Sequence, residues 1–203
     1  IDQTIRNIVT TAENASASLI KSLTIEPIST GLSEYETQIG AIQTILANTS
    51  NYGTTLKDVN STLNELNRYS DMTIYNFTQM TKNIGTFTAA GVDLKTSASS
   101  IKGIANLAAV SGSTAEQAST AMYQLSQAIA AGSVKLQDWN SVVNAGMGGQ
   151  VFQNALIRTA AVMDDSAKNV DAWRKKNIDS YGSFRESLTK GAWLTTDVLT
   201  ETL

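Results

Sequence analysis

The 203-residue sequence contains no cysteine and no histidine. Without thiols and imidazoles the chain cannot form disulfide frameworks, Cys/His zinc sites or a Ser-His-Asp triad. Proline is almost missing as well, since Pro27 is the single one beside 13 glycines. Long helical patterns tolerate that combination, whereas loop-rich β domains rarely show it. These absences favour an α-rich protein that is not an enzyme.

Charge and long apolar runs are scarce too. The chain carries 15 basic and 18 acidic residues, a net charge of −3, which does not favour binding to a polyanion such as DNA. The longest apolar stretch, 104–110, is interrupted by Asn106, and spanning a bilayer takes roughly 18 to 20 apolar residues. We therefore expect no specific nucleic-acid partner and no membrane span in this segment. Because the chain starts at Ile1 and stops in mid-pattern, we interpret it as a piece of a longer protein.

Apolar residues recur every three or four positions along the chain, which is the pattern of amphipathic helices. Helix-ending residues interrupt this pattern at Pro27, Gly53, Gly91, Gly112, Gly132 and Gly146. The sequence thus predicts an all-α fold, a compact bundle of about seven to nine short to medium helices with helix hairpins and no sheet.

The same pattern divides the chain into three regions. Residues 1–30 form a leading amphipathic helix and a break, the helix running over 1–23. Residues 31–163 form the main helical domain. Residues 164–203 form a helical extension that is richer in basic and aromatic residues and is truncated at its C-terminus.

Capping patterns locate several helix ends. Capping boxes are expected at Ser33 to Glu36 and at Ser113 to Glu116, and single N-caps at Thr55 and Thr96. Gly91 is expected in the left-handed position after a helix, and Gly132 is expected to end the Ala-rich helix.

The Ala-rich helix presents one face of small residues, which we predict to be a packing surface in an antiparallel hairpin with the helix before it. The small residues of this face are Ala118, Ala121, Ala128 and Ala131, and the larger Leu125 belongs to the same predicted packing surface. A second set comprises the positions whose replacement should most alter the fold, namely Gly132, Trp139, Gly146, Gly148 and Gly149.

Possible chemical motifs have simpler interpretations. Gly146-Met147-Gly148-Gly149 lacks the Lys-Ser or Lys-Thr of a phosphate-binding loop, so a helix-helix turn is favoured. The acidic pairs Glu34/Glu36 and Asp164/Asp165 lack the spacing of a calcium loop. Arg174-Lys175-Lys176 beside Trp173 could contact single-stranded nucleic acid, but a solvated helix face with a buried tryptophan is favoured. We predict no catalytic residue, no metal site and no cofactor.

Two blocks carry a family resemblance. Within 96–156, residues 101–132 read as a helix, a Ser/Thr-Glu cap and an Ala-rich helix ending in Gly132, and Val134-Lys135-Leu136-Gln137-Asp138-Trp139 comes next. This block resembles the tape-measure domain of tail tape-measure proteins from long-tailed bacteriophages. Residues 183–188 and 193–199 resemble the segment C-terminal to that domain in tape-measure proteins from phages and prophages of Gram-positive hosts.

The resemblance implies a structural protein in the lumen of the virion tail, present in the host cytoplasm during assembly. It implies that the protein sets tail length, scaffolds the tail tube and is released at DNA ejection. Implied partners are the tail tube protein, tail-tip or baseplate proteins, tail assembly chaperones and further copies of the chain, three or six in number. The alternative is a non-enzymatic bacterial helical bundle of the filament or signalling type, although such proteins run in long unbroken heptads.

Overall fold

The computed structural model describes residues 32–73 and 75–203. In this part of the chain the fold is all-α, with ten α-helices and no β-strand. The α-helices are α2 (Leu32–Thr49), α3 (Leu56–Ser70), α4 (Phe77–Ala89), α5 (Leu94–Ser111), α6 (Ala115–Ala130), α7 (Leu136–Asn144), α8 (Gln150–Met163), α9 (Val170–Asn177), α10 (Phe184–Lys190) and α11 (Thr196–Thr202). Two 3-10 turns accompany them, η1 (Ser50–Tyr52) and η2 (Asp179–Tyr181).

The predicted all-α fold without a sheet is confirmed for the described residues. The described residues form ten α-helices, whereas about seven to nine were expected. The extension after residue 163 accounts for the higher number, because it divides into three helices of seven or eight residues. The helix expected over residues 1–23 lies outside the described residues.

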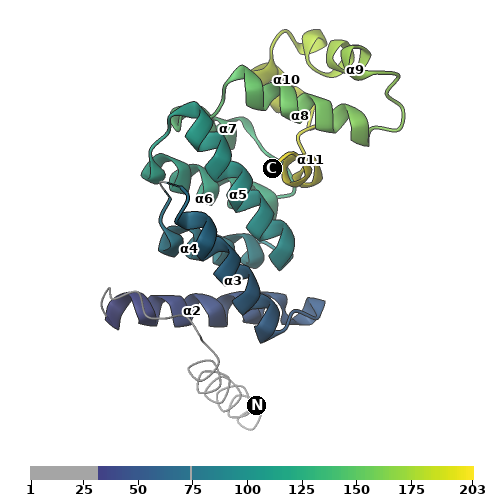
Figure 1. Ribbon diagram of the computed structural model, residues 1–203. Helices are drawn as coiled ribbons and strands as arrows, with labels where there is room; N and C mark the ends of the chain where they lie inside the picture. Colours follow the sequence, from purple (N-terminus) through teal and green to yellow (C-terminus); the bar gives the residue numbers. More distant parts are fainter. Residues whose placement is uncertain (1–31, 74) are drawn as a thin grey trace.

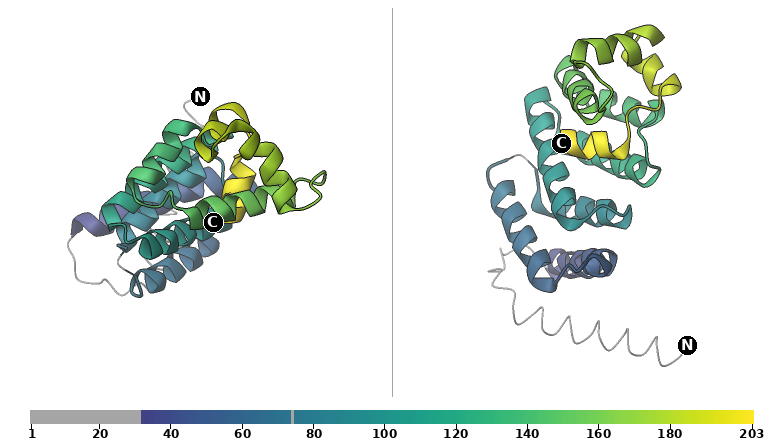
Figure 2. Two further views of the ribbon diagram at one scale, coloured as in Figure 1. Left: turned by 90° about the horizontal axis from the view of Figure 1, so that it is seen from above. Right: turned by 90° about the vertical axis from the view of Figure 1, so that its right-hand side faces the viewer.

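The helices are stacked along the molecule in sequence order, apart from the last one. Figure 1 shows α2 at one end, α8, α9 and α10 at the other, and α4 to α7 between them. Helix α11 reverses this order, since it returns from the far end and packs against α8 near the middle of the molecule (Figure 2). The C-terminal extension therefore lies against the main helical domain, while the predicted boundary at residues 163 and 164 stays a prediction.

Seven of the described α-helices, α3 to α6 and α9 to α11, are capped at their N-termini by short polar side chains, but often one or a few residues from the expected position. Thr55 caps α3 in a reciprocal pair with Asp58, whose amide donates to Thr55 Oγ1 (3.3 Å) and whose Oδ2 accepts from the Thr55 amide (2.8 Å). The predicted cap at Thr96 is wrong, because Asp93 caps α5 and Thr96 donates its amide to Asp93 Oδ1 (3.0 Å). Ser33 is likewise no N-cap, since α2 begins at Leu32.

The cap of α6 differs from the expectation by one residue. Thr114 and Gln117 form the capping box, with the Gln117 amide donating to Thr114 Oγ1 (3.2 Å), so the predicted box of Ser113 and Glu116 is wrong. Ser113 does not cap α6 because its hydroxyl makes a different hydrogen bond. Its buried hydroxyl donates to the carbonyl of Ala145 in a short hydrogen bond.

The end of α7 is a Schellman motif, in which two amides after the helix satisfy carbonyls of its last turn. The Gly146 amide donates to Val143 O (2.8 Å) and the Met147 amide to Val142 O (3.0 Å). Gly146 has φ +77°, a left-handed conformation that costs a residue with a Cβ free energy. Gly91 has φ +89° after α4, so its predicted left-handed position is confirmed.

Aromatic rings join the main domain to the extension. Trp139 on α7 lies 5.8 Å from Phe152 on α8 and 4.7 Å from Phe184 on α10, measured between ring centroids. Trp193 makes edge-to-face contacts with Phe184 at 5.5 Å and with Trp173 at 5.4 Å. These five rings, which we call the aromatic cluster, are all buried. Edge-to-face and offset arrangements of this kind stabilise a core beyond the area that they bury.

Replacing Trp139 by alanine tests the importance of the aromatic cluster. Trp139 is 1% exposed, so Trp139→Ala removes a central ring and leaves a cavity, and we expect a loss of about 3 to 5 kcal/mol in the free energy of unfolding. Urea denaturation followed by circular dichroism measures it. The control is Tyr123→Ala, which truncates a side chain that is 48% exposed and should cost within about 0.5 kcal/mol. Equal losses in both variants would contradict the assignment.

Candidate functional site

The predicted small-residue face of α6 is buried inside the chain, except for Ala131, which is the C-cap of the helix and is exposed. Ala118 and Ala121 are 0% exposed, and Leu125 and Ala128 are 2% exposed. Helix α6 contacts α4, α5 and α7, and the contact with α5 forms the predicted hairpin. On its α4 side, Asn83 Nδ2 donates to Ser119 Oγ (3.3 Å) and lies 3.4 Å from Met122 Sδ. This face therefore serves the fold of one chain and is not free for a partner.

A different part of the molecule presents an exposed face, built from the α5–α6 turn and the α7–α8 turn. The hydrogen bond from Ser113 to Ala145 joins the two turns, and Tyr75 adds a contact from its hydroxyl to Ser113 O (3.4 Å). We call residues 110–114 and 143–151 the turn face. The sequence does not reveal the role of Ser113, because a serine before a helix has the pattern of a cap.

The turn face carries no charge. Neither 103–115 nor 139–157 contains Asp, Glu, Lys or Arg. Val110 and Val151 are 77% and 72% exposed there, and Val143 is 39% exposed. Such a surface can pack against an uncharged neighbour without desolvating an ion, which is costly. Residues 110–114 and 143–151 contain no ionisable side chain.

The predicted glycines of this region have unequal roles. A Cβ on Gly148 would lie 2.5 Å from Val143 Cγ2 and 3.1 Å from Val143 Cα, so the turn has no room for a side chain. A Cβ on Gly149 would meet no atom within 4 Å. Gly149 is the N-cap of α8 in an extended conformation that any residue adopts. The structure thus brings Gly146 and Gly148 into the packed part of the turn and leaves Gly149 at its open edge.

Gly132 lies away from the turn face, where α11 docks. Its carbonyl accepts from the Thr196 amide (3.2 Å), and the Thr196 hydroxyl donates to Ile129 O (3.1 Å). Next to it, the Val134 amide donates to Leu194 O (2.9 Å). Val134, Asp138 and Trp139 of the sequence motif are all buried, and Asp138 Oδ2 accepts from the Lys135 amide (2.9 Å). The motif is therefore part of the seam between the main domain and the extension.

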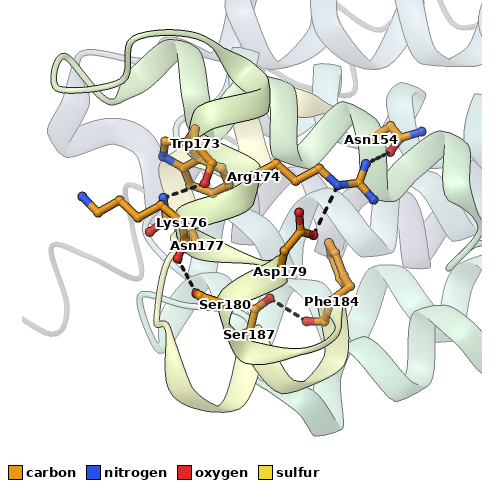
Figure 3. Close-up of polar contacts among 9 residues, drawn as sticks. All are labelled: Asn154, Trp173, Arg174, Lys176, Asn177, Asp179, Ser180, Phe184 and Ser187. Carbon is orange, nitrogen blue, oxygen red and sulfur yellow. Dashed lines mark hydrogen bonds and ion pairs between the residues drawn. The ribbon is translucent and has the colours of Figure 1, made fainter.

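One basic residue of α9, Arg174, is held in a polar network of the chain itself (Figure 3). Arg174 Nη1 donates to Asn154 Oδ1 on α8 (3.4 Å), and Arg174 Nε lies 3.7 Å from Asp179 Oδ1. Trp173 is 5% exposed and donates its indole N–H to Asp164 Oδ2 (3.1 Å). Its ring is therefore not available for stacking on a base, which confirms the interpretation of a buried tryptophan beside a solvated basic face.

Asp164 connects the end of α8 to α9. Besides the indole of Trp173, its carboxylate accepts from the Ser166 hydroxyl (2.6 Å) and the Ser166 amide (3.0 Å). The Ser166 hydroxyl and amide, together with the Trp173 indole, hold the pKa of Asp164 below its usual value. The predicted capping or surface role of this residue fits these contacts.

Other kinds of site find no support in the described part of the chain. Among residues 32–73 and 75–203, no group of three or more acidic side chains is placed to hold a metal ion. No helix in these same residues combines the length and the apolar character needed to cross a membrane.

A comparison with protein families gives one match. A family model described as tape measure protein matches residues 36–170, which is more than half of the 203 residues. The match includes the turn face and the Val134–Trp139 motif. No curated protein and no solved structure matches the chain.

The same substitution at two neighbouring glycines tests the packing of the turn. Gly148→Ser would drive a side chain into Val143, and we expect it to cost about 1 to 3 kcal/mol of unfolding free energy. Gly149→Ser places a favoured N-cap residue at an open position, so its effect should stay within about 0.5 kcal/mol. Both are read from urea denaturation. A Gly149 variant as unstable as the Gly148 variant would contradict this account of the turn.

The hydrogen bonds of Asp164 make a prediction about pH. A carboxyl whose pKa is lowered in the folded state stabilises the protein above its unfolded pKa, and this stabilisation is lost as the pH falls through the folded pKa. The difference in unfolding free energy between the wild type and Asp164→Asn should therefore shrink as the pH falls from about 5 to about 2. Tryptophan fluorescence during urea denaturation measures it at each pH. A difference that is constant over this range would show that the charge of Asp164 does not contribute.

Proposed function

Because the chain belongs to the tape measure protein family, we propose that it is the part of such a protein that anchors and organises tail assembly, while the length-measuring helices lie elsewhere. Membership gives the chain a structural role in the phage tail and a location within the tail. The family is a structural one. Our proposal concerns which step of tail construction these residues serve.

The proposal rests on the shortness of the helices. A helix rises 1.5 Å per residue, so it can convert chain length into distance only if it runs unbroken. The longest described α-helices, α2 and α5, have 18 residues each, and such a helix spans only about 27 Å. After each of them the chain turns and packs against the preceding helices (Figures 1 and 2). Folded this way, these residues add little length and supply a packed body with exposed faces.

The turn face is the surface best suited to assembly contacts. It is uncharged and carries exposed valines, so it can pack against an uncharged protein surface in a confined tube. We propose as partners the tail tube protein, tail-tip or baseplate proteins and tail assembly chaperones, and further copies of the chain, three or six per tail. In this proposal the complete protein sets tail length, is present in the host cytoplasm during assembly, and leaves the tail at DNA ejection.

Removing residues 36–170 in frame from the gene in its phage genome separates the two roles. For an assembly domain, we expect the deletion to abolish tails or to yield tubes of no defined length. A ruler segment would instead give normal tails that are shorter by about 200 Å, the helical length of the deleted residues. Electron microscopy of lysates measures tail number and length. Uniform tails shortened by that amount would overturn the proposal.

A length-neutral variant serves as the control for this deletion. Gly148→Ser keeps every residue but destabilises the turn, so an assembly role predicts fewer tails, each of normal length. Gly149→Ser should leave both tail number and tail length unchanged.

A further inference from the structure

A groove of about 510 Å³ runs between α2 and α4, outside the sites described above. Ala41 and Thr44 form its α2 wall. Its α4 wall comes from one face of that helix and includes Thr81, Lys82, Gly85 and Thr86. Because most of these residues are small and Gly85 has no side chain, the two helices leave a furrow where larger residues would fill the space.

The groove is apolar although threonines line it. The hydroxyls of Thr44, Thr81 and Thr86 donate to the carbonyls four residues earlier, at Gly40 (2.9 Å), Phe77 (2.9 Å) and Lys82 (3.2 Å). They need no polar partner from an occupant. The Thr44 methyl lies 3.9 Å from the Cβ position of Gly85. The groove thus offers methyl groups and bare backbone to whatever binds there.

One wall of the groove carries a positively charged side chain. Among the described residues that line it, Lys82 is the only charged one, and its side chain is exposed. A complementary ligand is therefore an apolar helix face with an acidic residue at its edge, which matches the way amphipathic helices enter grooves.

We propose that the occupant is the segment 1–23 of the same chain, which precedes the residues matched by the family model. This segment carries an apolar stripe at helical spacing, comprising Ile1, Ile5, Ile8, Val9, Ala12, Leu19, Ile20 and Leu23. Only eight residues, 24–31, separate it from the start of α2, and they contain Pro27. Connections of this length join antiparallel neighbouring helices.

In an antiparallel hairpin of segment 1–23 with α2, apolar residues of the segment lie at the level of the groove. Thr44 is twelve residues into α2, about 18 Å from its start. An antiparallel helix that ends at Leu23 reaches the same level near residue 11. In this register Ile8, Val9 and Ala12 lie along the groove, and Glu13 lies within about one residue of the level of Ala41, at a groove whose other wall carries Lys82. Apolar fit and charge complementarity therefore coincide in one arrangement.

The absence of native cysteine makes disulfide cross-linking a direct test. In the double variant Ala12→Cys, Thr86→Cys, the two thiols are within reach only if the segment occupies the groove, since a disulfide needs Cα atoms closer than about 7 Å. The matched control is Ala12→Cys, Lys175→Cys, whose second position is exposed on α9. Both proteins are oxidised at low concentration and analysed by non-reducing electrophoresis and mass spectrometry.

We expect the Ala12/Thr86 pair to form an intrachain disulfide at least tenfold faster than the control pair. Equal rates in the two proteins would overturn the proposal. So would a product that is mainly an interchain dimer, because a second copy of the chain would then be the occupant.

A groove-filling variant gives a second readout that does not depend on introduced thiols. Ala89 lines the groove and is exposed, so Ala89→Trp can fill the groove with little effect on the core. We expect trypsin to cut after Arg6 and Lys21 at least fivefold faster in Ala89→Trp than in the wild type, because the segment is displaced. Tyr123→Trp, at an exposed position on α6, should keep the wild-type rate. Unchanged cleavage in Ala89→Trp, with circular dichroism showing a folded protein, would also overturn the proposal.

Discussion

Early helix termination is the constraint on which this structure depends. None of the described α-helices exceeds 18 residues, and short isolated helices are marginal in water, so each must bury an apolar face against a neighbour. The left-handed glycine after α7 shows how the stop is built, because the amides of Gly146 and Met147 satisfy the last carbonyls while the chain turns back. Met147 is then buried, at 1% exposure. The residues that end the helix thus also contribute to the buried core.

Because the chain has few charged residues, the specific packing of its helices depends on hydroxyl groups, amide groups and shape complementarity. The Ser113 hydroxyl joins two turns, Thr196 fixes α11 to the end of α6, and Asn83 connects α4 with α6. Each contact pairs a buried or half-buried polar group, which would otherwise cost free energy, and each links elements far apart in the sequence. Such contacts are insensitive to salt compared with surface ion pairs. These uncharged polar groups therefore help to set the register of the fold.

Local signals in the sequence were sufficient for the fold class and for the helix ends at glycines. The stops at Gly91, Gly112 and Gly146 depend on neighbouring residues alone, and so does the cap at Thr55. The cap of α6 shows the limit. Ser113 and Thr114 have equal capping chemistry, and only the position of Ala145, 32 residues later, decides that Ser113 bonds across the turns. The aromatic cluster was unpredictable for the same reason, because periodicity marks Trp139 as buried but does not identify Phe184 as its neighbour. Gly148 and Gly149 look alike in sequence and differ only in what surrounds them.

A packed body of short helices and an extended ruler differ in what they require of a chain, and in our proposal the complete protein contains both. An unbroken helix exposes its apolar face along its whole length and must find partners there, whereas these helices bury theirs within one chain. The packed body is consequently the part that can keep its structure before any neighbour arrives. In our proposals the groove beside α2 is filled by the same chain, and the uncharged turn face is left to contact a neighbour. A folded body with such a surface suits the start of an assembly better than the measurement of its length.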